Sequence, residues 1–188
     1  MEHVNISFML GHWGKRSRPN DRGVSSNGYV EAYENLKLMA DVAIAIEEKT
    51  NKAIRVQLLC DGNYSERAQR SNQIGSKLFI AWHLNYTPGG NYTLVIYDHR
   101  NSSNVGFARE LATAIGKVLN IPANVWSSWD PSKQKPRRGF NNIKHVNAPA
   151  FILETCFIDN PVHMKRLKQN YDSLVDAIAN TIINYINP

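Results

Sequence analysis

Residues 78–84 read LFIAWHL, a run that is apolar at every position except His83. A run with no polar alternation is typical of a strand that is buried on both faces, as in a parallel sheet. Similar apolar runs occupy residues 4–10 and 150–153, and helical spacing fills residues 31–49 and 105–119 between them. Strands that alternate with helices in this way predict an α/β fold.

The whole chain, residues 1–188, is expected to form one domain, since this length suits a single core. We expect a mixed, largely parallel twisted sheet, flanked by helices on both faces. Further strands are expected at residues 54–59 and 92–97, and a polar helix at about 65–75. Residues 122–147 are expected to be irregular. One continuous C-terminal helix is expected to pack on the sheet through Leu167, Tyr171, Leu174, Ile178, Ile182 and Ile186.

The chain is basic, with 22 Lys and Arg against 16 Asp and Glu and a net charge of +6. Such a surface favours polyanions: nucleic acid, anionic membranes or the acidic polymers of bacterial walls. No phosphate-binding glycine loop or nucleic-acid-binding signature appears, so no nucleic-acid partner is expected. No apolar run approaches ~20 residues, so no membrane insertion is expected. Glu2, His3 and Asn5 interrupt any signal-peptide core, which predicts a protein without one.

Polar side chains follow the three most apolar runs: His12, His83 and Glu154. If these runs are adjacent parallel strands, the three residues converge at one edge of the sheet, where α/β folds form their sites. Histidines with carboxylates suit a catalytic zinc, which keeps one position open and lowers the pKa of water towards ~7. A buried, unpaired carboxylate costs several kcal/mol, so Glu154 calls for a metal, a cation or a catalytic role.

A further ligand is expected from the helix that begins near Glu31. Glu31 and Glu34 share one face of its first turn, where carboxylates also favour the helix dipole without any metal. Spacing alone leaves both residues open as the ligand.

Five short motifs follow one another along almost the whole chain: GHWG at 11–14, NGYVEA at 27–32, AWHLN at 81–85, RG at 138–139 and ETCFIDN at 154–160. In this order they resemble the motifs of the zinc-dependent N-acetylmuramoyl-L-alanine amidases, which include bacteriophage endolysins. The family patterns are Gly-His-Gly-Gly, Asn-Gly followed by Glu-Ala, Ser-x-His-x-Asn, Arg-Gly and Glu-x-Gly-Phe-x-x-Asn. Three positions depart from them without removing a ligand: Trp13, Ala81 and Cys156.

The resemblance implies roles for individual residues. It favours Glu31 over Glu34 and makes the zinc ligands His12, Glu31 and His83. It makes Glu154 the catalytic carboxylate. It also makes three residues candidates for substrate binding: Trp13, Asn85 and Arg138.

The resemblance further implies an enzyme that hydrolyses the amide bond between N-acetylmuramic acid and L-alanine in peptidoglycan, as an endolysin or autolysin. Residues 1–188 would be its catalytic domain, with no separate wall-binding domain. Without a signal peptide, the protein is expected to stay in the cytoplasm until lysis and then to act on the cell wall. Its basic run could steer it to anionic wall polymers or form a solvated loop: Lys133, Lys135, Arg137 and Arg138.

Other classes remain open from the residues alone. A zinc peptidase acting on the peptide stem commonly carries a His-x-x-Glu pair, but Lys15 stands at that spacing after His12. A non-catalytic module that binds the wall or nucleic acid could stack sugars or bases on Trp13, Trp126 and Trp129. A cysteine hydrolase would need a histidine close to Cys156.

Overall fold

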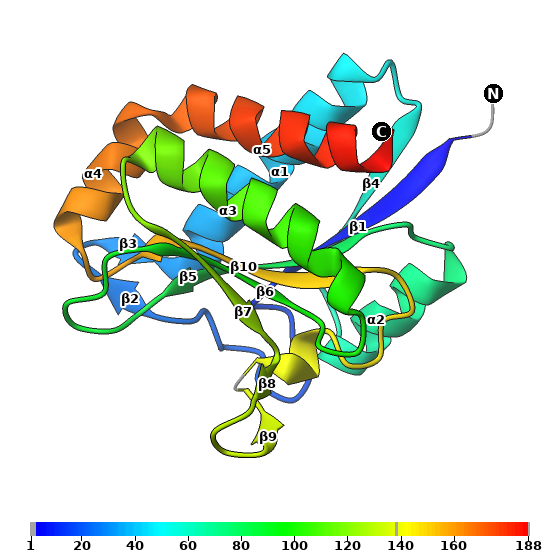
Figure 1. Cartoon of the computed structure of the whole chain (residues 1–188), viewed down its shortest axis with the longest axis horizontal. Coiled ribbons are helices and arrows are strands. Elements are labelled where there is room, and N and C mark those ends of the chain that lie inside the picture. The colour runs from blue at the N-terminus through cyan, green and yellow to red at the C-terminus, as the bar shows by residue number, and fades with distance from the viewer. Residues whose placement is uncertain (1–2, 138, 188) are drawn as a thin grey trace.

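The computed structural model describes residues 3–137 and 139–187. It is built on a six-stranded sheet in the order β4-β1-β5-β10-β6-β7 (Figure 1). The strands are β1 (Val4–Leu10), β4 (Ile54–Leu59), β5 (Phe79–Asn85), β6 (Thr93–Tyr97), β7 (Ala123–Ser127) and β10 (Ala150–Phe157). Short pairs form β2 (Ser25–Ser26) with β3 (Tyr29–Val30) and β8 (Trp129–Asp130) with β9 (Lys135–Pro136).

The helices are α1 (Glu31–Lys49), α2 (Tyr64–Gln73), α3 (Val105–Leu119), α4 (Pro161–Gln169) and α5 (Tyr171–Ile186), with 3-10 turns η1 (Ser102–Asn104) and η2 (Phe140–Asn142). Strands β4, β1, β5 and β10 run parallel, whereas β6 is antiparallel to β10. The predicted α/β fold with a mixed, largely parallel sheet is therefore confirmed.

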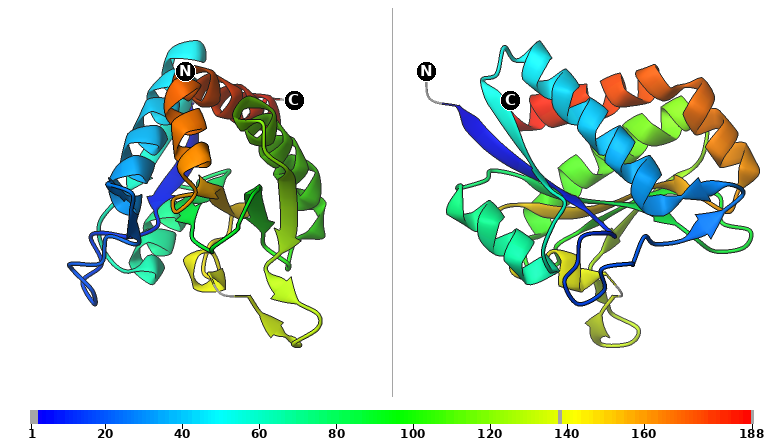
Figure 2. Two further views of the ribbon diagram at one scale, coloured as in Figure 1. Left: turned by 90° about the vertical axis from the view of Figure 1, so that its left-hand side faces the viewer. Right: turned by 180° about the vertical axis from the view of Figure 1, so that it is seen from behind.

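The sheet divides the apolar core into two layers. Helices α1, α3 and α5 cover one face, here called the helix face, where Phe151 and Leu153 of β10 are buried (Figures 1 and 2). The other face, here called the lower face, buries Ile152 together with Leu94 and Ile96 of β6. Helix α2, η2 and the β8–β9 hairpin lie on this lower side (Figures 1 and 2). Alternation along β10 as far as Glu154 therefore decides which of its side chains lie below the sheet.

The C-terminal segment differs from the single helix that the periodicity predicts. It breaks at Asn170, whose backbone N–H and side-chain amide both donate to the Arg166 carbonyl. Buried residues lie on both sides of the break, including Leu167 and Leu174. The i+3/i+4 spacing of apolar residues continues across the break, because α4 and α5 pack on the same core. This spacing therefore predicts one helix where there are two.

Part of the segment expected to be irregular, residues 122–147, is regular. It contains edge strand β7, which pairs with β6, and the β8–β9 hairpin. β7 is only partly buried, so its sequence lacks the continuous apolar run that marks the central strands. Within the described ranges, no helix combines the length and apolarity needed to cross a bilayer.

Candidate metal centre

The candidate centre lies at the carboxyl ends of β1, β5 and β10, three adjacent parallel strands. His12 lies just beyond β1, and His83 lies in β5 directly opposite Glu154 of β10. Glu31 is the first residue of α1, which starts beside this edge. The polar residues that follow the three apolar strands therefore lie at one edge of the sheet.

His12, Glu31 and His83 each offer a ligand atom, and these atoms all lie within 4.8 Å of one another. Glu31 Oε1 is 3.4 Å from His12 Nε2 and 3.2 Å from His83 Nδ1. A tetrahedral ion with bonds of ~2.0 Å has ligands about 3.3 Å apart, so these spacings and this donor set fit zinc. Glu34 instead forms an ion pair with Lys168, so only Glu31 joins the histidines.

Two glycines leave the room that these side chains occupy. A Cβ at Gly11 would lie 2.2 Å from the His83 ring, and one at Gly23 would lie 2.4 Å from Glu31 Oε2. Gly23 also has a positive φ of +73°, which side-chain-bearing residues rarely adopt. At both positions the backbone lies so close to the cluster that a side chain would clash with it.

Hydrogen bonds fix the Glu31 carboxylate, which is almost fully buried. Its Oε2 accepts from the Val24 N–H and its Oε1 from the Leu84 N–H. Burial raises the pKa of Glu31, but the hydrogen bond with His83 and the histidine charges lower it below its ordinary value. These contacts therefore favour the carboxylate form of Glu31, which is the form that binds a metal ion.

The two histidines differ electrostatically. Burial lowers the pKa of His12, and the charge of Glu31 offsets this only in part. Burial also disfavours the charged form of His83, but the Glu31 hydrogen bond and the Glu154 charge reverse the direction and raise its pKa. In both histidines, burial lowers the pKa and the neighbouring carboxylates raise it.

Asp21 belongs to the site, although nothing in its sequence context marks it. Its Oδ1 lies 2.8 Å from His12 Nδ1, and its Oδ2 accepts from the Lys15 ammonium. Burial would raise the pKa of Asp21, but the hydrogen bonds from Lys15 and the Gly23 N–H hold it well below its usual range. A carboxylate behind a metal-ligating histidine fixes its tautomer and orientation.

Arg67 of α2 is a second residue that sequence reasoning missed. Its side chain is fully buried and donates to backbone carbonyls of Leu10, Trp13, Cys60 and Gly62. These carbonyls lie at the ends of β1 and β4 and in the loop that carries His12. A signal existed: Arg67, Ala68 and Ser71 form one buried stripe of an otherwise polar helix.

Glu154 is half-buried and lies on the lower face, since it alternates with Leu153 of the helix-face core. Its backbone carbonyl accepts from the Thr93 hydroxyl. The carboxylate is close enough to His83 for its charge to raise the pKa of that ring. This places an acid–base group beside the three candidate ligands.

The remaining predicted residues have different surroundings. Trp13 follows His12 with a positive φ of 74°, and its ring packs 5.2 Å from that of Tyr33. Asn85 ends β5 and accepts from the Tyr86 N–H through Oδ1. Arg138 lies outside the described residues.

Cys156 is fully buried in the helix-face core. Its thiol lies 4.0 Å from the Met164 sulfur, and burial raises its pKa to about 12. Such a thiol is a poor nucleophile at neutral pH. The register of β10 shifts between Glu154 and Phe157, which explains why Cys156 does not share the face of Glu154.

Known proteins share both sequence and fold with this chain. The endolysin of Bacillus phage SPP1 is 26% identical over 173 residues, which are 90% of this chain and 59% of that protein. The chain thus spans about three-fifths of the length of this curated relative.

Two solved structures illustrate the similarity in fold. The N-acetylmuramoyl-L-alanine amidase from Clostridium difficile 630 has a TM-score of 0.80 at 18% identity, covering 100% of this chain and 98% of that one. The catalytic domain of the amidase CwlV from Bacillus (Paenibacillus) polymyxa var. colistinus has a TM-score of 0.79 at 18% identity, covering 98% of both. A sequence model described as N-acetylmuramoyl-L-alanine amidase matches residues 8–184, and the chain therefore belongs to that amidase family.

Proposed function

We propose that the chain is a zinc-dependent enzyme that hydrolyses the amide bond between N-acetylmuramic acid and L-alanine in peptidoglycan. The observation that carries the proposal is the cluster of His12, Glu31 and His83 beside Glu154, in a chain of this amidase family. The donor set of two imidazoles and one carboxylate is that of a catalytic zinc site with an open position.

The proposed ligands are the nitrogens of His12 and His83 and the carboxylate of Glu31. A bound Zn²⁺ would polarise the scissile carbonyl and lower the pKa of water. Asp21 holds the His12 ring through Nδ1, which leaves Nε2 facing Glu31 and the ligand cluster.

Glu154 is proposed to move the proton. It would accept a proton from the attacking water and return it to the leaving amine of L-alanine. Its place opposite His83 supports this role, because it stands at the cluster without being one of the three grouped ligands. Trp13, Asn85 and Arg138 are proposed substrate contacts.

The site of action is proposed to be the cell wall, reached after release at lysis, as the similarity to a phage endolysin supports. Anionic wall polymers are a proposed further partner, because the chain carries a net charge of +6.

The test is to digest purified peptidoglycan and to label new amino termini and reducing ends, with and without a chelator. The expected products are new L-alanine amino termini without new reducing sugars, lost with the chelator and restored by Zn²⁺. Glu154→Ala should retain zinc and lose these products. New termini elsewhere in the stem would identify a peptidase instead, and binding without products would identify a wall-binding module.

A further inference from the structure

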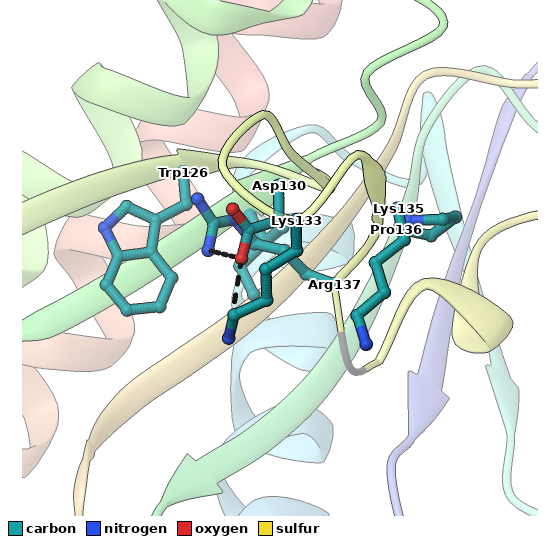
Figure 3. Close-up of a pocket in the computed structure, with 7 residues that line it drawn as sticks. Trp126, Asp130, Lys133, Lys135, Pro136 and Arg137 are labelled. Atoms are coloured by element: carbon teal, nitrogen blue, oxygen red, sulfur yellow. Dashed lines mark hydrogen bonds and ion pairs between the residues drawn. The ribbon is translucent and has the colours of Figure 1, made fainter.

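A cavity of ≈ 490 Å³ lies between β7 and the β8–β9 hairpin, apart from the candidate metal ligands (Figure 3). It is lined by Ile96, Trp126, Asp130, Lys133, Lys135, Pro136 and Arg137. We propose that this cavity binds a free carboxylate on the second or third residue of the peptide stem, counted from the scissile bond. The inference rests on the proposed function and adds a preference among its substrates.

The cavity opens on the same sheet face as Glu154. Glu154 pairs with Leu94, and Ile152 pairs with Ile96, which lines the cavity. Ile96 in turn pairs with Trp126 of β7. Residues paired across a sheet share a face, so Glu154 and the cavity belong to one surface.

The separation corresponds to a short length of peptide. β10, β6 and β7 are consecutive strands, so β7 lies about 10 Å from β10 at ~4.8 Å per strand. An extended peptide spans about 3.3 Å per residue, so roughly three residues cover this distance. If the amine of the first stem residue lies at Glu154, the end of the third residue reaches the cavity. The second residue ends about 7 Å along and reaches the cavity only through its carboxylate-bearing branch.

The order of the strands indicates that the peptide half of the substrate, and not the sugar half, faces the cavity. The ligand-bearing edge at β1 and β5 lies on one side of Glu154, and the cavity lies on the other. Glu154 is proposed to return a proton to the leaving amine, which is the peptide half of the broken bond. The peptide half would therefore extend from Glu154 towards β7 and the cavity, away from the metal ligands.

Positive charge exceeds negative charge in the lining. Asp130 lies 3.4 Å from Arg137 and 3.8 Å from Lys133, so one carboxylate faces both. Lys135 is exposed and forms no ion pair with any residue that the structure describes. Lys133 and Lys135 extend from the hairpin in the same direction (Figure 3). A carboxylate would find two ammonium groups there.

The cavity is held in shape by contacts within the hairpin and β7. Arg137 Nε donates to the Ser127 carbonyl at 3.1 Å, and its guanidinium lies 5.1 Å from the centre of the Trp126 ring. Asp130 accepts from both the backbone N–H and the hydroxyl of Ser132. Trp126, 38% exposed, and Ile96 supply an apolar floor below the charged rim. Such a site fits an aliphatic side chain that ends in a carboxylate.

The test uses soluble muropeptides with free carboxylates at residues two and three, and versions carrying a carboxamide at one position. For the unaltered chain, amidation at one of the two positions should lower kcat/KM by about tenfold, because charge-assisted contacts are lost. The double substitution Lys133→Gln/Lys135→Gln should lower kcat/KM for the free acid to the same extent. Amidation should then have no further effect in that variant.

The matched control is Lys52→Gln/Lys77→Gln, which removes the same charge from exposed sites before β4 and β5. It should keep the preference for the free acid. The proposal is overturned if amidation at neither position matters, or if the Lys133/Lys135 variant keeps the preference. It is equally overturned if that variant changes only sedimentation with intact walls, because the lysines then serve wall polymers. Failure to release L-alanine termini from any muropeptide would instead refute the proposed function, and the subsite with it.

Discussion

His12 and Asp21 are joined by a 2.8 Å contact between the imidazole Nδ1 and the carboxylate Oδ1, which leaves His12 Nε2 facing Glu31. The same carboxylate is held by Lys15 and by the Gly23 N–H. The histidine is therefore oriented by a loop that is itself tied down at several points.

Asp21→Asn tests this orientation. We expect zinc affinity to fall about tenfold to a hundredfold, because the amide cannot fix the imidazole as a carboxylate does. The measurement is competition with a chromophoric zinc chelator. Asp61→Asn is the control, since the Asp61 carboxylate is exposed and forms an ion pair with Arg70 at 3.6 Å. Equal affinities for the Asp21 variant and the unaltered chain would show that the contact does not position His12.

Gly11→Ala tests the close approach of backbone to ligand. A Cβ would lie 2.2 Å from the His83 ring, so the imidazole must move and bound zinc should be lost. Metal content after dialysis, measured by mass spectrometry, gives the result. Gly106→Ala in α3 is the control, because its Cβ would meet nothing within 4 Å. Full zinc content in both variants would show that the space beside Gly11 is not needed to hold His83 in place.

Arg67→Gln tests the buried guanidinium. Loss of its hydrogen bonds leaves several carbonyls unpaired, so the free energy of unfolding should fall by about 3 kcal/mol or more. Urea denaturation measures this fall. Arg55→Gln, at an exposed position in β4, should change it by less than about 0.5 kcal/mol. If the two variants are equally stable, Arg67 does not hold the strand ends.

Tyr171→Phe tests a contact between α1 and α5. The Tyr171 hydroxyl donates to Asp41 Oδ2 at 2.7 Å, and Lys37 contacts the same oxygen. The contact is partly exposed, so we expect a loss of about 0.5–1 kcal/mol in unfolding free energy at pH 7.

The pH dependence of this loss has a defined sign. The hydrogen bond from Tyr171 lowers the pKa of Asp41 below its ordinary value of 3.8. Its stabilisation is thus present above pH 3.8 and is lost as the pH falls through the lower folded-state pKa. Burial and Asp41 raise the pKa of Tyr171, so its contribution is lost only as the pH rises through that higher value. Urea unfolding at pH 7, 4 and 3 measures the acid limb, which belongs to Asp41, with Tyr86→Phe as an exposed control. A loss that is constant down to pH 3 would contradict the linkage.

The sequence predicts the centre of the fold because β1, β5 and β10 are apolar at almost every position, and so must be buried on both faces. Once those strands are adjacent, the residues that end them must meet, which places His12 beside His83. The choice of Glu31 over Glu34 required the family resemblance, because both lie in the same helical turn.

Other features escape a reading of the sequence for physical reasons. The carboxylate of Asp21 lies in a polar loop with no periodicity, and its role depends on how that loop folds back. Arg67 bonds to Leu10, 57 residues away, and no local pattern encodes that distance. The break at Asn170 leaves the apolar spacing unchanged, so periodicity cannot reveal it.

Among the residues that the structure describes, β8 and β9 pair with each other, as a two-stranded sheet separate from the six-stranded one. Its connecting residues, 131–134, can therefore change in length or charge without altering any strand pairing next to Glu154. The connecting loop of the hairpin is therefore a position where the sequence can be exchanged by design. If the proposed function holds, grafting loops of different charge at residues 131–134 would change the preference among stem peptides while the sheet stays the same.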